Sequence, residues 1–178
     1  MGKQRDRDQP AEIVREYGPF PGAPHVNGVS FDGRLVWFAG GEKLQAFEPA
    51  SGRIVRALDV ACDAGTAFDG RHLFQIAGDR IHKIDPVTGE ILSTIPAPGG
   101  GRDSGLAWGE GALWVGEYRS RKIHQIDPET GEVLTRLTMP EGTGVSGLES
   151  DQDDLFYAGG GGSGRVRAVR KPRRRSGR

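Results

Sequence analysis

The sequence predicts an all-β fold built from four copies of one unit. The segment DPVTGEIL at 85–92 recurs as DPETGEVL at 127–134, and a looser copy, EPASGRIV, occupies 48–55. Each copy follows a glycine that opens a short segment ending in an aromatic residue. The leading glycines, with a fourth that begins an incomplete copy, are Gly28, Gly65, Gly105 and Gly147. They recur roughly every 40 residues, the period of four-stranded propeller blades. We therefore predict a β-propeller of four blades, each with four antiparallel strands.

The third repeat shows the strands of one blade most clearly. Its β-forming runs are 104–108, 112–116, 122–126 and 132–137. The third run alternates polar and apolar residues, which is typical of a half-buried strand. Between the last two runs, Pro128 cannot donate to a ladder and Gly131 can supply a positive φ, so this segment is a turn. Trp37 and Trp114 occupy the same place on second strands, and we expect both to be buried between blades.

The ends of the chain suggest how the ring closes. The last repeat supplies strands at 145–149, 154–158 and 165–169 but no outer strand. Residues 12–17 have strand character and belong to no repeat, so we predict that this N-terminal strand completes the last blade and removes an unpaired edge. The predicted domain spans 11–170, after a disordered N-terminus at 1–10 and before a basic disordered tail at 171–178.

Composition limits the classes of function. The formal net charge is zero, so no overall field favours nucleic acid. The sequence shows neither a secretory signal nor an apolar stretch of membrane-spanning length, and Cys62 is the only cysteine. These features predict a cytoplasmic protein that binds neither a membrane nor nucleic acid.

The repeat resembles a known group of bacterial propellers. The segment 105–134, with GLAW, LWVG and IHQIDPETGEVL in order, is similar to the blades of the YVTN, glutamine-cyclotransferase-like and virginiamycin B lyase-like families. The resemblance covers about residues 12–170. It implies rings of five to seven blades, so the four repeats here either close alone or form part of a larger ring completed by a second chain.

The resemblance also implies two kinds of chemistry. Cyclisation of an N-terminal glutamine would use a carboxylate as general acid and base, and Glu117 or Glu149 could take that role. Lyase chemistry would use a histidine and a glutamate with Mg²⁺. His25 is the only histidine at a predicted channel entry.

Polar residues precede each repeated glycine, where the inner strands should enter the central channel. The four sets, at 25–27, 62–64, 102–104 and 144–146, are polar and differ between blades. A packing position would repeat, so the variation predicts a polar funnel that binds a small polar ligand. The predicted ligand-binding residues are His25, Asn27, Arg102, Ser104, Tyr118 and Ser146.

The carboxylates near this funnel are the candidate catalytic and metal-binding groups. The catalytic candidates are Asp63, Asp103, Glu117 and Glu149. Asp63 and Asp103 could approach each other across the ring, where mutual repulsion would provide an acid and a base. The same pair could hold a hard cation, Mg²⁺ or Ca²⁺.

Two classes of function follow from the sequence. The first is a scaffold that binds a small polar ligand or a protein partner, and the alternative is a lyase or a glutaminyl cyclotransferase-type enzyme that uses the funnel carboxylates, with or without a divalent cation. The scaffold is expected to be a monomer, or an oligomer if the four repeats belong to a larger ring.

Overall fold

The computed structural model describes residues 14–40, 42–151, 154–159 and 166–172. Within these ranges the chain forms fifteen β-strands and no helix. Blade 1 contains β1 (Val29–Phe31), β2 (Val36–Gly40), β3 (Lys43–Phe47) and β4 (Ile54–Leu58). Blade 2 contains β5 (Thr66–Phe68), β6 (Leu73–Ala77), β7 (Arg80–Ile84) and β8 (Ile91–Pro96). Blade 3 contains β9 (Asp103–Gly109), β10 (Ala112–Glu117), β11 (Lys122–Ile126) and β12 (Val133–Thr138). Blade 4 contains β13 (Gly147–Ser150), β14 (Leu155–Gly159) and β15 (Val166–Arg170).

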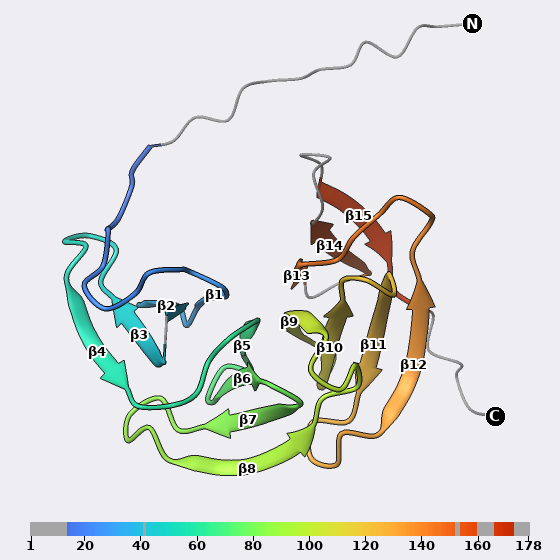
Figure 1. The fold of residues 1–178 in the computed structure, drawn as a ribbon, viewed down its shortest axis with the longest axis horizontal. Helices are drawn as coiled ribbons and strands as arrows, with labels where there is room; N and C mark the ends of the chain where they lie inside the picture. Colours follow the sequence, from blue (N-terminus) through green and yellow to red (C-terminus); the bar gives the residue numbers. More distant parts are fainter. Residues whose placement is uncertain (1–13, 41, 152–153, 160–165, 173–178) are drawn as a thin grey trace, which may run out of the picture.

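The blades are arranged around a common axis, as the repeat predicted. Within each sheet, strands that are consecutive in sequence pair antiparallel. Figure 1 looks along the axis, with β1, β5, β9 and β13 around the centre and β4, β8 and β12 at the periphery. The all-β fold and the four-bladed propeller arrangement are thereby confirmed.

The repeated Asp-Pro-x-Thr-Gly segment is a turn between the third and fourth strands of a blade. In blade 2, the Asp85 Oδ1 atom accepts hydrogen bonds from the N–H groups of Val87 (2.7 Å) and Thr88 (2.9 Å). Gly89 has a φ of 78°, which a glycine adopts without strain. Asp127 makes the same two bonds in blade 3. The motif recurs because it closes this turn.

The core lies in the seams between successive blades. Three clusters of buried apolar residues fill the seams between blades 1 and 2, 2 and 3, and 3 and 4. Each contains or adjoins the aromatic residue at the centre of a second strand: Trp37, Phe74 and Trp114 are 1%, 0% and 0% exposed. The predicted burial of both tryptophans is confirmed.

The N-terminal segment requires a correction. The sequence predicted that residues 12–17 would complete blade 4, but residues 14–17 form no strand and lie against blade 1 instead. The Tyr17 hydroxyl donates to the carbonyl oxygen of Pro49 (2.8 Å), in the turn before β4, and an Arg15 guanidinium nitrogen donates to the same oxygen (3.0 Å). Within the described residues, the fourth sheet has three strands.

Aromatic packing explains why the segment lies there. Phe38 and Phe47 project from the face of blade 1 that points away from blade 2. The Tyr17 ring is centred 4.5 Å from Phe47, and the Phe20 ring is centred 4.5 Å from Phe38. Covering these rings removes apolar surface from water, whereas pairing along β15 would leave them exposed.

The described strands of blades 1 and 4 are not in contact. Among the described strands, no Cα atom of blade 1 lies within 8 Å of one in blade 4, although every other pair of successive blades is in contact through the inner strands. Figure 1 shows the corresponding gap in the ring between β1 and β13. The described blades therefore form an open arc.

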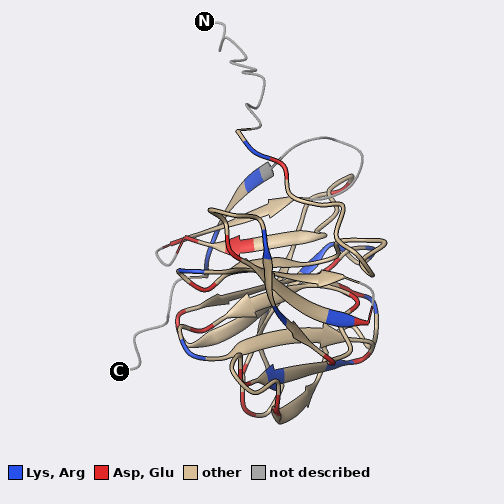
Figure 2. Ribbon diagram, turned by 90° about the vertical axis from the view of Figure 1, so that its left-hand side faces the viewer, with Lys and Arg blue, Asp and Glu red and all other residues tan. Residues whose placement is uncertain are grey.

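Of the two predicted domain boundaries, the one at residue 11 lies outside the described residues and the one at residue 170 lies within them. The expected disordered N-terminus at 1–10 is outside them, as is the part of the expected tail from 173 on. Lys171, the first residue of that tail, is buried and donates its N–H to the Asp154 carbonyl oxygen (2.8 Å). Figure 2, which views the molecule from one side, shows acidic and basic residues interspersed along the strands and turns. The described part of the chain contains no helix long and apolar enough to cross a membrane.

Candidate functional site

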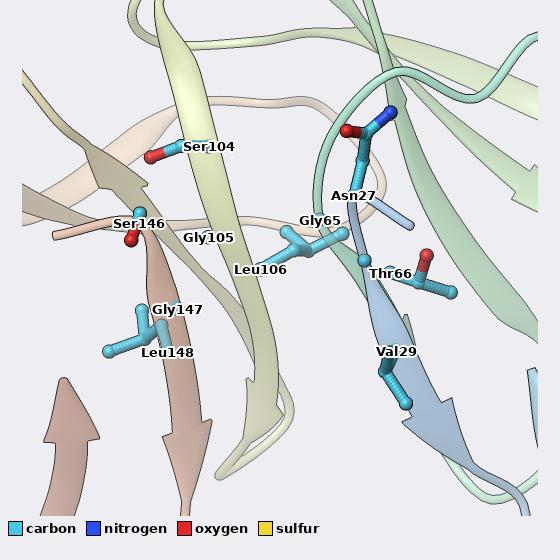
Figure 3. A pocket seen from close by; sticks show the side chains of 11 residues that line it. Asn27, Val29, Gly65, Thr66, Ser104, Gly105, Leu106, Ser146, Gly147 and Leu148 are labelled. Carbon is cyan, nitrogen blue, oxygen red and sulfur yellow. The ribbon is translucent and has the colours of Figure 1, made fainter. Parts of the chain in front are cut away.

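A cavity of about 220 Å³ lies on the axis, between the inner strands of all four blades. Residues at and beside the four repeated glycines line it. They are Asn27, Gly28, Val29, Gly65, Thr66, Ser104, Gly105, Leu106, Ser146, Gly147 and Leu148. In the view of Figure 3, Ser104 and Ser146 lie together on the left, and Asn27 and Thr66 lie on the right.

The glycines allow the inner strands to approach one another. A Cβ atom at Gly28 would lie 2.5 Å from the Ala64 carbonyl oxygen, and one at Gly65 would lie 2.5 Å from the Leu106 nitrogen. At Gly105 the nearest atom, the Leu148 Cβ, would be 3.0 Å away. Close approach, rather than an unusual φ, therefore explains the glycine at this position in blades 1, 2 and 3.

The polar groups of the cavity are hydrogen-bond acceptors without formal charge. The Ser104 hydroxyl donates to the Val145 carbonyl oxygen (2.6 Å), and the Ser146 hydroxyl donates to that of Gly159 (3.3 Å). The Thr66 hydroxyl donates to Gln75 Oε1 (2.6 Å). Because these protons are directed at protein acceptors, each of the three oxygens has a lone pair that these bonds do not use, although Thr66 is only 4% exposed. The Asn27 side chain is exposed and adds an amide that both donates and accepts.

The structure brings three of the six predicted ligand-binding residues to the cavity. Asn27, Ser104 and Ser146 line it, whereas His25, Arg102 and Tyr118 are not among its lining residues. His25 is exposed in the segment before β1, and Tyr118 is 42% exposed with its ring beside Gly144.

Sequence reasoning missed Thr66. Its position follows the repeated glycine, where the other repeats carry Val29, Leu106 and Leu148. The presence of a polar residue where the three other repeats have an apolar one could have indicated that Thr66 lines the channel.

Beside the cavity, blade 3 contains a cluster of buried ionisable groups. Glu117 and Asp103 are paired residues of β10 and β9 and are 5% and 7% exposed. The Glu117 Oε2 atom lies 3.3 Å from Nε2 of the buried His124, and Oε1 lies 3.3 Å from Nε of Arg102. His124 Nδ1 is buried and has no hydrogen-bond partner within the described residues. His124 lies on β11, and its contact with Glu117 of β10 depends on the register of these two strands.

The two carboxyl groups of this cluster have opposite pKa shifts. Burial raises the pKa of Asp103, and the nearby charge of Glu117 raises it further, despite hydrogen bonds from the Gly99 N–H to both carboxylate oxygens (2.9 and 3.0 Å). Burial also acts to raise the pKa of Glu117, but Ser120, His124 and Arg102 outweigh it, and the net pKa is lowered. The surroundings of Asp103 therefore favour its protonated form, whereas the partners of Glu117 favour its ionised form.

Asp103→Asn should change the pH dependence of stability. A carboxyl group with a raised folded pKa stabilises the fold below its unfolded pKa of about 3.9, and this contribution is lost as the pH rises through the folded pKa. As the pH rises from about 4 to 7, we expect the free energy of unfolding of the variant to increase relative to that of the wild type. Urea titration at each pH measures both values.

Asp85→Asn is the matched control for that experiment. The turn N–H groups of Thr88 and Val87 lower the pKa of Asp85, so its contribution appears above the unfolded pKa and is lost as the pH falls through the folded pKa. As the pH rises, the free energy of unfolding of the Asp85 variant should therefore decrease relative to that of the wild type. Equal slopes for both variants would contradict the assignment of Asp103.

The remaining carboxylates lie apart from the cavity lining. Asp63 accepts hydrogen bonds from the Gly78 N–H through Oδ2 (3.0 Å) and Oδ1 (3.2 Å), so it is bound to a blade 2 turn. Glu149 lies on β13, on the face that points away from blade 3. The surrounding protein desolvates the Glu149 carboxyl and raises its pKa, despite the hydrogen bond from the Ser150 N–H and although the residue as a whole is exposed. No group of three or more His, Cys, Asp or Glu residues in the described part is placed to hold a metal ion. A cation held by Asp63 and Asp103 alone stays a prediction.

Comparison with known proteins shows similarity of fold. No protein-family model matches the chain, and no curated protein matches it. Among solved structures, a glutaminyl cyclase from Myxococcus xanthus is 15% identical with a TM-score of 0.62, covering 75% of this chain and 67% of that one. The computationally designed protein Ika4 is 16% identical with a TM-score of 0.59, covering 90% and 98%.

A third similar structure is that of U3-55K, which is 18% identical with a TM-score of 0.62. The alignment covers 89% of this chain and 52% of that one, so this chain spans about half of its length. At these identities the similarity concerns the fold alone. The comparisons thus support a β-propeller, one of whose structural neighbours is a glutaminyl cyclase.

Proposed function

We propose that the axial cavity binds a small neutral molecule rich in hydrogen-bond donors, such as a primary amide or a polyol. The observation that carries this proposal is the acceptor surface formed by the Thr66, Ser104 and Ser146 hydroxyl oxygens. None of the residues that line the described cavity carries a formal charge, so a charged ligand would lack a counter-ion there.

Size and apolar contacts narrow the ligand class. About 220 Å³ is below the range of roughly 300–1,000 Å³ that is typical for drug-sized ligands, which favours a compact molecule. Val29, Leu106 and Leu148, from three different inner strands, supply apolar contact in the same cavity. The name of the Myxococcus neighbour refers to a glutaminyl group, which carries a primary amide, and an amide fits the acceptors found here.

A thermal-shift titration tests the proposal with two probes, N-acetylglutaminamide and myo-inositol. A ligand that binds only the folded state adds about 2.7 kcal/mol at 100 times its Kd, so at least one probe should raise the Tm. The double variant Asn27→Ala and Ser146→Ala should abolish the shift with little loss of stability, because both side chains are exposed.

His25→Ala is the matched control, since His25 is exposed near Asn27 but does not line the cavity. The control should respond to the probes as the wild type does. A Tm that neither probe changes in the wild type, or a full shift in the double variant, would contradict the proposed site.

The enzymatic alternative finds its support in the Asp103 and Glu117 pair. Opposite pKa shifts on two neighbouring carboxyl groups are the arrangement that provides an acid and a base. Both groups are buried outside the cavity lining, so a substrate in the cavity would not reach them directly. This placement makes ligand binding the function that the geometry supports better.

A further inference from the structure

The outer face of blade 4, which points away from blade 3, repeats the strand register of a seam but lacks a partner within the described chain. It differs from the three seams in one residue, because Glu149 stands where the other blades carry Ser30, Ala67 and Ala107. Tyr157 pairs with Glu149 in the same register that places Trp37 opposite Ser30 and Trp114 opposite Ala107. The two tryptophans are at most 1% exposed, because the next blade covers them, whereas Tyr157 is 43% exposed. Similarly, a Cβ atom at Gly147 would meet nothing within 4 Å.

The outer face of blade 1 is the complementary half. Val29 and Phe31 each are 58% exposed on β1. The residues in the same positions of blade 3, Leu106 and Trp108, pack against blade 2. Tyr17 and Phe20 cover only the more peripheral rings of this face. A hollow of about 530 Å³ beside β3 adds to its uneven surface.

We propose that a second copy of this chain packs its blade 1 face, with Val29 and Phe31, against the blade 4 face of the first copy, with Gly147 and Tyr157. The contact repeats a packing that the chain already makes three times, between blades 1 and 2, 2 and 3, and 3 and 4. In each of those seams, a glycine of one blade approaches the inner strand of the next, and a buried aromatic residue of its second strand lies in the seam.

Continuity with these seams is the reason to choose a second copy as the occupant. The two exposed faces are the two halves of one seam, so two identical chains supply both halves with the inner-strand register already set. The contact is heterologous, because it joins different surfaces of the two copies. Association would remove the exposed side chains of Val29 and Phe31 on one face and of Tyr157 on the other from water.

Sedimentation velocity of the full 178-residue chain tests the proposal. The wild type should associate with increasing concentration into dimers or larger species. Two variants should each be monomeric: one carries Val29→Asp and Phe31→Asp, and the other carries Tyr157→Arg. Each variant lacks one half of every contact.

Mixing the two variants in equal amounts provides the decisive measurement. The blade 4 face of the first variant and the blade 1 face of the second remain intact, so the mixture should form a species of two chains and no larger one. A symmetric contact between like faces would give a different pattern, because each single variant would then keep one active face.

Two matched controls separate the faces from general surface effects. Val87 is 66% exposed and Tyr118 is 42% exposed, both away from the two faces, so Val87→Asp and Tyr118→Arg should associate like the wild type. Thermal melts establish that every variant is folded. A monomeric wild type at all concentrations, a single-face variant that still associates, or a mixture that stays monomeric would overturn the proposal.

Discussion

Replacing Trp114 by alanine is expected to lower the free energy of unfolding by about 3–5 kcal/mol. The indole is 0% exposed and its ring is centred 4.2 Å from that of Phe156 in the next blade. Its Nε1–H donates to the Gly109 carbonyl oxygen (3.2 Å), and the variant loses this buried hydrogen bond. Alanine would therefore leave a cavity within the seam between blades 3 and 4. Urea titration followed by circular dichroism measures the loss.

The same substitution at the equivalent position of blade 4 is its control. Tyr157 stands where Trp114 stands in blade 3, but it is 43% exposed. Tyr157→Ala should cost less than about 1 kcal/mol when the chain is monomeric, since little packing is lost from an exposed site. If the two alanine variants lost equal stability, the burial assigned to the seam would be wrong.

The sequence could predict the blades because the repeat marks the same structural positions in each one. The turn made by Asp85 and Asp127 recurs with its hydrogen bonds, and the repeated glycine lies at the same place on or just before each inner strand. Asn27, Ser104 and Ser146 could be assigned to the channel for the same reason, since each lies one residue before the repeated glycine.

The position of the N-terminal segment could not be predicted in this way. Strand character over 12–17 says that the backbone can pair with an edge, but not which edge it meets. The competing contact is tertiary: Tyr17 and Phe20 stack on rings of blade 1 that no local pattern shows to be facing outward. Burial of aromatic surface outweighed the available edge of β15.

The contacts within the cluster in blade 3 could not be predicted from the sequence for a related reason. Arg102, Asp103 and Glu117 were each singled out near the funnel, but their contacts depend on the pairing of β9 with β10 and of β10 with β11. That pairing turns Glu117 toward His124 and Arg102 and away from the axis. The candidate carboxylates consequently became neighbours of the cavity instead of its lining.

Gly65→Ala is expected to be the other strongly destabilising single substitution. The new methyl group would lie 2.5 Å from the Leu106 nitrogen and 2.8 Å from the Ser104 carbonyl oxygen. Both are backbone atoms of β9, so relief requires the inner strands of blades 2 and 3 to separate. Overpacking of this kind typically costs about 1–3 kcal/mol, and a contact with backbone belongs near the upper end. Thermal unfolding and urea titration measure the effect.

The other repeated glycines turn this expectation into a graded series. Gly105→Ala would place its methyl group 3.0 Å from the Leu148 Cβ, a side-chain atom with more freedom to shift, so its cost should be smaller. Gly147→Ala would meet nothing within 4 Å, and its φ is not in the positive range. In the monomeric chain it should be neutral or should stabilise by about 0.4–1 kcal/mol, because alanine restricts the unfolded state. A uniform loss across the three variants would mean that the glycines serve backbone conformation; a loss that declines from Gly65 to Gly147 would mean that they serve the close approach of neighbouring blades.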